Sequence, residues 1–109
     1  MVAVILSLSK FVAAMPAIAS ELILRPVTPA DVPVLFSLIQ ALAEYELLSH
    51  AVTGNAEALQ EHLFSIHPYI EAIIAEYAGQ AVGFALFFSN YSTFLTQPGI
   101  YLEDLFKYT

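Results

Sequence analysis

The sequence predicts an α+β domain with a mainly antiparallel sheet, in the order strand, helix, helix, strand, strand, strand. Three observations support this fold class. An apolar stripe recurs at helical spacing between residues 32 and 43, two strand-like runs flank a short glycine-containing turn at residues 78–80, and another apolar run covers residues 100–106. Short turns join antiparallel strands, whereas parallel strands need long crossovers, so the second half of the chain favours antiparallel pairing.

The first strand and the first helix are defined by their ends. Residues 22–24 form an apolar run that stops at Arg25 and Pro26, and Thr28, Pro29 and Asp31 follow as a capping pattern. This pattern places a hydroxyl at the cap, a proline at the first helical position and a carboxylate near the positive end of the helix. The apolar stripe that follows consists of Val32, Leu35, Phe36, Ile39, Leu42 and Ala43, and Pro33 is expected to distort the first turn.

A second helix and three more strands complete the expected order. After a loop at residues 49–54, Thr53 or Asn55 can cap a helix that ends near His67 and Pro68. Its apolar face consists of Ala56, Leu59, Leu63 and Phe64. Strands are expected at residues 70–77 and 81–88, joined by a tight turn in which Gly79 supplies the positive φ. A polar, aromatic loop over residues 90–99 then leads to the last strand at residues 100–106.

Charge and composition exclude several classes of function. Ten acidic and three basic residues give a net charge of -7, which repels phosphate backbones, so nucleic acid is not an expected partner. The chain has no cysteine and therefore no disulfide, thiolate metal site or cysteine nucleophile, which agrees with a cytoplasmic location. The histidines His50, His62 and His67 lack the i, i+4 spacing of a helical metal site, so no metal is expected.

Residues 1–21 differ in composition from the rest and are interpreted as an apolar N-terminal extension before a domain at residues 22–109. Lys10 in the middle of this stretch argues against a membrane-spanning helix, and no membrane partner is expected. A signal peptide stays open as an alternative. Residues 17–19 before Ser20 resemble a small-x-small cleavage site, although a basic region at the start is missing.

Four strings of residues are together more specific. Residues 24–26 and 28–31 have the sequences LRP and TPAD, residues 42–46 have LAEYE, residues 82–88 have VGFALFF, and residues 101–106 have YLEDLF. In this order and spacing they resemble the diamine acetyltransferase branch of the GNAT superfamily of N-acetyltransferases. The resemblance covers residues 22–106 and implies the N-terminal half of that fold. It also implies acetyl-CoA as co-substrate, in a cleft beside the fourth strand, and a small cationic amine of the diamine or polyamine type as acceptor.

The resemblance further implies contacts for individual residues. The main chain of Leu105, Phe106 and Lys107 matches the segment that contacts acetyl-CoA, where the pantetheine arm pairs with a strand edge. Tyr45 and Glu46 match a Tyr-Glu pair that contacts the amine substrate. Side-chain identity matters little in the segment of Leu105, Phe106 and Lys107, because backbone groups make its hydrogen bonds.

The acidic pair Glu103 and Asp104 is the expected centre of the amine site. In the resembling family, carboxylates at these positions bind the polyamine and help to deprotonate its ammonium, which must lose a proton before its nitrogen can attack the thioester. Successive side chains of a strand point to opposite faces, so at most one of the two is expected to face the cleft. Glu103 is assigned to that position and to catalysis.

One expected motif is missing from the sequence. GNAT enzymes hold the cofactor pyrophosphate with an R/Q-x-x-G-x-G/A loop just after the fourth strand. Here the last glycine is Gly99, and only residues 107–109 follow Phe106. We therefore expect a truncated domain that binds acetyl-CoA weakly, does not turn over alone, and self-associates through a bare strand edge. The alternative function is a non-catalytic domain that pairs through this edge with itself or with a full-length homologue.

Overall fold

The structure is a computed structural model that describes residues 22–108 of the 109-residue chain. The N-terminal extension assigned to residues 1–21, the membrane span rejected there and the signal peptide left open all lie outside the described residues, as does Thr109. The domain boundary at residue 22 stays a prediction. Within residues 22–108, no helix is long and apolar enough to cross a membrane.

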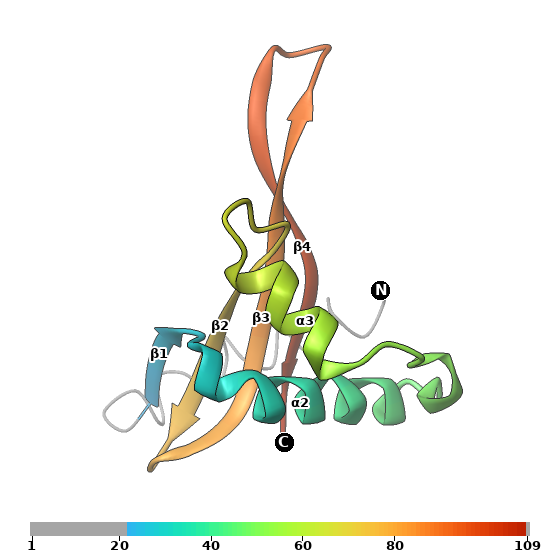
Figure 1. Ribbon diagram of the computed structural model, residues 1–109, viewed down its shortest axis with the longest axis vertical. Coiled ribbons are helices and arrows are strands. Elements are labelled where there is room, and N and C mark those ends of the chain that lie inside the picture. Colours follow the sequence, from blue (N-terminus) through green and yellow to red (C-terminus); the bar gives the residue numbers. More distant parts are fainter. Residues whose placement is uncertain (1–21, 109) are drawn as a thin grey trace.

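Two helices cover one face of a four-stranded antiparallel sheet (Figure 1). The strands β1 (Leu22–Pro26), β2 (Glu71–Tyr77), β3 (Gln80–Ser92) and β4 (Gln97–Lys107) lie side by side in chain order, and the helices are α2 (Val32–Tyr45) and α3 (Ala56–Phe64). Short 3-10 helices at Pro29–Asp31 and Ser49–Ala51 precede and follow α2. The predicted element order and the antiparallel sheet are confirmed.

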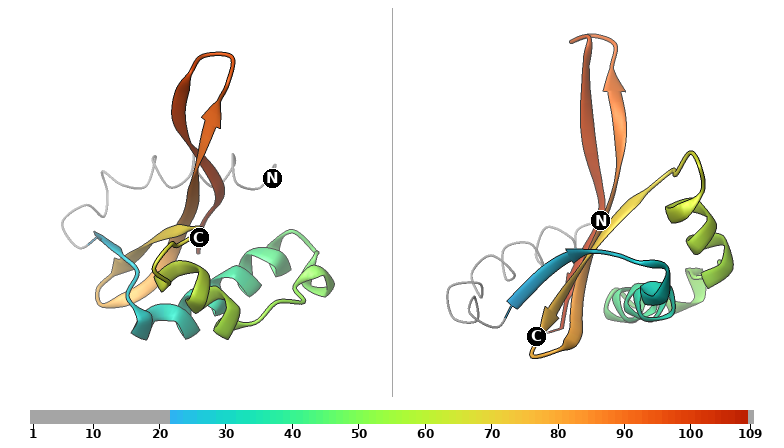
Figure 2. Two further views of the ribbon diagram at one scale, coloured as in Figure 1. Left: turned by 45° about the horizontal axis from the view of Figure 1, so that its top comes forward. Right: turned by 60° about the vertical axis from the view of Figure 1, so that its left-hand side comes forward.

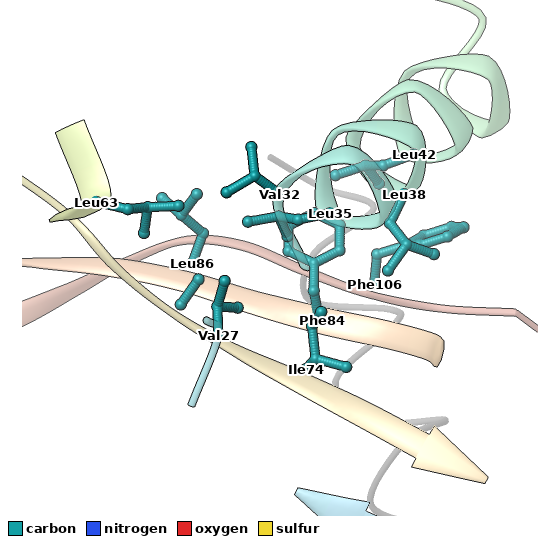
Figure 3. Packing of buried hydrophobic residues seen from close by; sticks show 11 residues of the cluster. Val27, Val32, Leu35, Leu38, Leu42, Leu63, Ile74, Phe84, Leu86 and Phe106 are labelled. Carbon is teal, nitrogen blue, oxygen red and sulfur yellow. The ribbon is translucent and has the colours of Figure 1, made fainter. Parts of the chain in front are cut away.

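The core lies between α2 and the sheet (Figure 3). Val32, Leu35, Ile74 and Phe84 are almost completely buried, and the cluster extends to Leu38, Leu42, Leu63, Leu86 and Phe106. The predicted stripe of α2 omitted Leu38, which is 3% exposed, and included Phe36, Ile39 and Ala43, which are half-buried at its border. The stripe predicted the helix correctly, while the packing against β3 and β4 selected its innermost residues.

Arg25 connects β1 to the start of α2. Its guanidinium donates two hydrogen bonds to the Asp31 carboxylate, at 2.7 and 2.8 Å, and one to Glu76 of β2 at 2.9 Å. The backbone N–H and the hydroxyl of Thr28 donate to the same carboxylate. The predicted capping pattern therefore forms, but around a 3-10 turn at Pro29–Asp31, with Pro33 in the first turn of the α-helix that follows. The Arg25 guanidinium holds the pKa of Asp31 well below its usual range.

Asp31→Asn is expected to lower the stability of the domain at neutral pH and to flatten its acid-side pH dependence. The pKa of Asp31 is lower in the folded state than in the unfolded state, where it is near 3.8. The ionised group therefore stabilises the fold at pH values above 3.8, and this contribution is lost as the pH falls through the pKa of the folded state. Urea unfolding between pH 2 and 7 measures the effect. Glu61→Gln, on the exposed face of α3, is the matched control and should keep the wild-type profile. If the stability of Asp31→Asn depended on pH as that of the wild type does, the lowered pKa assigned to Asp31 would be contradicted.

The turn between β2 and β3 is shorter than predicted. Tyr77 pairs directly with Gln80, which leaves the two-residue loop Ala78-Gly79 with φ values of 51° and 82°. Two consecutive positive φ values match the twist of the flanking strands and are the geometry of tight hairpins. Gly79 takes this geometry without a steric penalty, as the sequence indicated, while Ala78 adopts it against its preference.

The polar loop predicted over residues 90–99 is wrong. Asn90, Tyr91 and Ser92 belong to β3, residues 97–99 belong to β4, and only residues 93–96 form the turn. The pairing of β3 with β4 satisfies the backbone groups of this polar segment, and a single-sequence pattern cannot show such a long-range partner. The last pair between β2 and β3 is Glu71 with Phe87, so residues 88–101 form a two-stranded ribbon that projects from the rest, called here the hairpin arm (Figures 1 and 2).

Candidate functional site

The site begins with a β-bulge in β4. Leu86 of β3 pairs with Asp104 and the next residue, Phe87, pairs with Leu102, so Glu103 is an extra residue in β4. A bulge of this kind bends the strand and changes the direction of its side chains. Asp104 and Phe106 share one side of β4 by ordinary alternation, and Phe106 belongs to the core under the helices. Asp104 therefore lies on the helix-covered face.

Both acidic residues line the same hollow. It has a volume of about 370 Å³ and lies between the C-terminal half of α2, the segment after it and the bulge. Its lining residues are Ile39, Leu42, Ala43, Glu46, Leu48, Ala51, Val52, Glu103 and Asp104. The expectation that at most one of Glu103 and Asp104 faces the cleft is wrong, because the bulge interrupts the alternation on which it was based.

Three carboxyl groups make this hollow strongly acidic. Burial, together with the neighbouring charges of Glu103 and Glu46, raises the pKa of Asp104 to about 6. Glu46 lies at the C-terminal end of α2, where the helix dipole also disfavours a negative charge. Its Oε1 is shielded from solvent and has no hydrogen-bond partner within residues 22–108. Clustering of these carboxyl groups away from water costs free energy, because each disfavours the charged form of its neighbours.

The other predicted site residues lie around this hollow or beside it. Glu46 lines it, as described, whereas Tyr45 is 51% exposed and packs its ring against Phe106 at a centroid distance of 6.5 Å, outside the lining. Leu105 and Phe106 are buried, and the segment from Leu105 to Lys107 pairs with β3. Its opposite edge is unpaired within the described residues, since β4 is the last strand of the sheet. Of this pair, only Glu46 lines the hollow, and the contact of both residues with an amine stays a prediction.

Gly83 allows β4 to approach β3 closely beside the site. A Cβ atom at this position would lie 2.4 Å from the carbonyl oxygen of Phe106 and 3.1 Å from the Cα of Lys107. Both are backbone atoms, which cannot move independently of the strand. The glycine in the VGFALFF string therefore sets the position of the β4 segment that the resemblance assigns to the cofactor.

Sequence reasoning missed one wall of the hollow. Leu48, Ala51 and Val52 come from the segment between the two helices, which was expected to be a plain loop and contains the 3-10 helix Ser49–Ala51. The run of apolar residues within a polar loop was the available signal. Among the described residues, no group of three or more histidines or carboxylates is arranged to hold a metal ion.

Comparison with known proteins gives the relatives of this chain. It is 32% identical to thialysine N-epsilon-acetyltransferase of Mus musculus over 91 residues, covering 76% of the chain and 53% of that protein. The corresponding Sus scrofa protein is 32% identical, covering 80% and 55%. An L-ornithine N5-acetyltransferase of Arabidopsis thaliana is 24% identical, covering 76% and 56%. The chain is related to the GNAT-type N-acetyltransferases.

Solved structures support the same fold. A metagenomic aminoglycoside acetyltransferase, crystallised with sisomicin, superposes with a TM-score of 0.65 at 19% identity, covering 83% of this chain and 58% of that one. An integron cassette protein from Vibrio cholerae superposes with a TM-score of 0.55 at 18% identity, covering 82% and 56%. No family model matches the sequence. The GNAT-type chain spans about half the length of the curated relatives it matches, and its strands and helices correspond to part of the acetyltransferase fold.

Asp104→Asn is expected to stabilise the GNAT-type domain above about pH 6. The pKa of Asp104 is higher in the folded state than in the unfolded state, where it is near 3.8. The group therefore stabilises the fold at pH values below 3.8, and this contribution is lost as the pH rises through about 6. The wild-type free energy of unfolding should therefore fall between pH 4 and 7, and the variant should lose most of that slope. Denaturant unfolding across this range tests it, with Glu61→Gln as control. A wild-type slope retained in Asp104→Asn would contradict the burial of this group.

Gly83→Ala is expected to displace the end of β4 and to destabilise the domain by about 1–3 kcal/mol, the usual range for forced overpacking. Gly54→Ala is the matched control, because a Cβ there meets nothing within 4 Å and the φ of Gly54 is not positive. Thermal unfolding and backbone amide shifts of residues 105–107 report the two effects. Equal behaviour of both variants would show that the close contact at Gly83 is not rigid.

Proposed function

We propose that this chain carries the amine-binding half of an acetyl-CoA-dependent N-acetyltransferase that acts on small cationic amines of the diamine or polyamine type. The observation that carries the proposal is the convergence of Glu46, Glu103 and Asp104 on one hollow at β4, the last strand of the sheet within residues 22–108. A primary ammonium is held by carboxylates and must then lose a proton to become nucleophilic. Two relatives are named for the acetylation of thialysine and of L-ornithine, and these names support an amine acceptor.

The three carboxyl groups are suited to different tasks. Glu46 and Glu103 would anchor the ammonium groups, since each adds negative charge to the hollow. The resemblance assigns deprotonation to Glu103. The structure favours sharing this task within the Glu103–Asp104 pair, with Asp104 better placed as base. A proton acceptor is most effective when its pKa lies near the working pH, and burial with the neighbouring carboxylates brings the pKa of Asp104 to about 6.

Acetyl-CoA would supply the thioester, whose C–S bond breaks as the amine nitrogen forms the new C–N bond. The chain's own contribution would be the main-chain edge of residues 105–107, which pairs with no further strand in the described part of the chain and could offer N–H and C=O groups to an extended amide ligand. The fit is partial, because the 109 residues contain no R/Q-x-x-G-x-G/A loop for the pyrophosphate. The proposal therefore includes weak cofactor binding and no turnover by the 109-residue polypeptide alone. A cytoplasmic location is also part of it and is based on the lack of cysteine.

A second candidate function is a non-catalytic domain that pairs through β4. The unpaired edge within the described residues favours it, because such an edge can add a strand from another chain. This candidate does not require the acidic hollow, so amine binding separates the two functions.

An NMR titration of the 109-residue chain with spermidine and with ornithine tests the amine site. Amide shifts are expected at Glu46, Glu103 and Asp104, with affinity falling at least tenfold in the variant that combines Glu46→Gln, Glu103→Gln and Asp104→Asn. Neutral N-acetylated amines are the matched ligand control. Absence of shifts at millimolar amine would reject the acidic hollow as an amine site.

Acetyl transfer is tested with a chimera. Residues 22–107 are fused to the C-terminal part of the mouse thialysine acetyltransferase, and acetylated product is measured. We expect turnover by the chimera and none by the 109-residue chain. Asp104→Asn in the chimera should lower kcat at least tenfold and weaken its pH dependence. Turnover by the 109-residue chain alone would overturn the proposed dependence on the missing loop.

A further inference from the structure

The helix α2 ends beside the acidic hollow in a backbone conformation that leucine disfavours. Leu47 has a φ of 59°, in the left-handed region, where the Cβ of an L-residue comes too close to a carbonyl oxygen. Glycine is the usual residue at this position of a helix end, because it has no Cβ. Leu47 is 86% exposed, so burial of its side chain offers little compensation. The strain therefore indicates a constraint on the backbone at this residue.

Two hydrogen bonds hold this conformation. The N–H of Leu48 donates to the carbonyl of Ala43 at 2.7 Å, and the N–H of Leu47 donates to the carbonyl of Glu44 at 3.0 Å. This pair of bonds is a Schellman motif, which requires a left-handed residue just after the helix. An apolar contact between the two ends of the motif commonly accompanies it, and here Leu48 and Ala43 both line the acidic hollow. The end of α2 and one wall of the hollow thus belong to the same motif.

The direction of the chain after α2 depends on this reversal. Glu46 lies directly before it, lines the hollow and has its Oε1 shielded from solvent. After the reversal the chain turns back toward α3 (Figure 1), and the segment 48–52 supplies the wall opposite the strand. A helix that continued past Glu46 would instead carry this segment forward along its own axis. The wall therefore exists because the helix stops at Leu47.

We propose that Leu47 is a positioning residue of the amine site: its left-handed backbone fixes the end of α2 so that Glu46 faces the acidic hollow and the segment 48–52 closes one wall. This inference rests on the amine-binding function proposed above. Leu47 acts through Glu46 and the wall, not through contact with an amine. A residue that accepts the left-handed conformation should keep the site, whereas a β-branched residue, which resists it, should disturb the site.

The wall that this reversal builds matches the chemistry of a diamine or polyamine. Such an amine has ammonium groups joined by methylene chains. The carboxyl groups of Glu46, Glu103 and Asp104 attract the ammonium groups, and the methylene groups gain free energy when they leave water for an apolar surface. Leu48 and Val52 offer that surface in the same hollow. A shift of the end of α2 would weaken both kinds of contact together.

The pKa of Asp104 gives a test that needs no amine. Burial, Glu103 and Glu46, in that order, raise this pKa to about 6. Leu47→Val should move Glu46 and the wall away from Asp104, so the pKa should fall toward its ordinary value of 3.8, as it should in Glu46→Gln. Leu47→Gly keeps the left-handed backbone and should leave the pKa near 6. Carboxyl carbon NMR of the 109-residue chain between pH 3 and 8 measures it.

Spermidine titration of the same variants measures the effect on the amine site. Leu47→Val should raise the Kd by about fivefold, the effect of losing one partly exposed ion pair, and Leu47→Gly should keep it within about twofold of wild type. Leu95→Val and Leu95→Gly are the matched controls, because Leu95 is 69% exposed, has no positive φ and lies in the turn of the hairpin arm. Both controls should keep the wild-type Kd and the wild-type pKa of Asp104.

Thermal unfolding followed by circular dichroism checks that the variants fold. Leu47→Gly should not lower the melting temperature, because glycine accepts the φ of 59° without strain. A lower melting temperature, a lower pKa of Asp104 or weaker spermidine binding in Leu47→Gly would overturn the proposal, and so would a folded Leu47→Val with wild-type values. If the wild type bound no spermidine, the proposed function would fail, while the pKa of Asp104 would still decide the role of Leu47.

Discussion

The pairing of β3 with β4 is the constraint on which the rest of the structure depends. It joins Phe84 to Phe106 in the core, and it requires Gly83 so that the two backbones can approach. Its single interruption, the bulge at Glu103, brings two carboxylates into one hollow. Its continuation past the body produces the hairpin arm. Core, candidate site and arm are thus successive parts of one hairpin.

Charge is divided along that hairpin. The half of β4 under α2 carries Glu103 and Asp104, which together with Glu46 form an acidic hollow partly removed from water. The other half carries no charge and exposes apolar side chains instead. Clustered carboxylates that are partly removed from water favour a cationic ligand, whereas an exposed apolar face favours another apolar surface. The two halves are therefore suited to different kinds of ligand.

Much of the fold could be predicted because its signals are local. The Thr28–Asp31 capping pattern, the stripe on α2 and the Asn55 cap, whose Oδ1 accepts a hydrogen bond from the Ala58 N–H, each depend on residues three or four positions apart. The missed features depend on distant partners. Leu38 became part of the core through packing on the sheet, and Asn90 to Ser92 became strand through pairing with residues 97–99.

The sequence by itself determined the element order, the turn at Gly79, the acidic charge and the family resemblance, since these follow from residue types and short spacings. It also singled out Glu46, Glu103 and Asp104. Only the tertiary structure decided that the three share one hollow, that Tyr45 lies outside it, and that Asp104 is buried enough to raise its pKa. A bulge is a mismatch between two strands, so neither strand's sequence shows it alone, and the direction of a carboxylate depends on that mismatch.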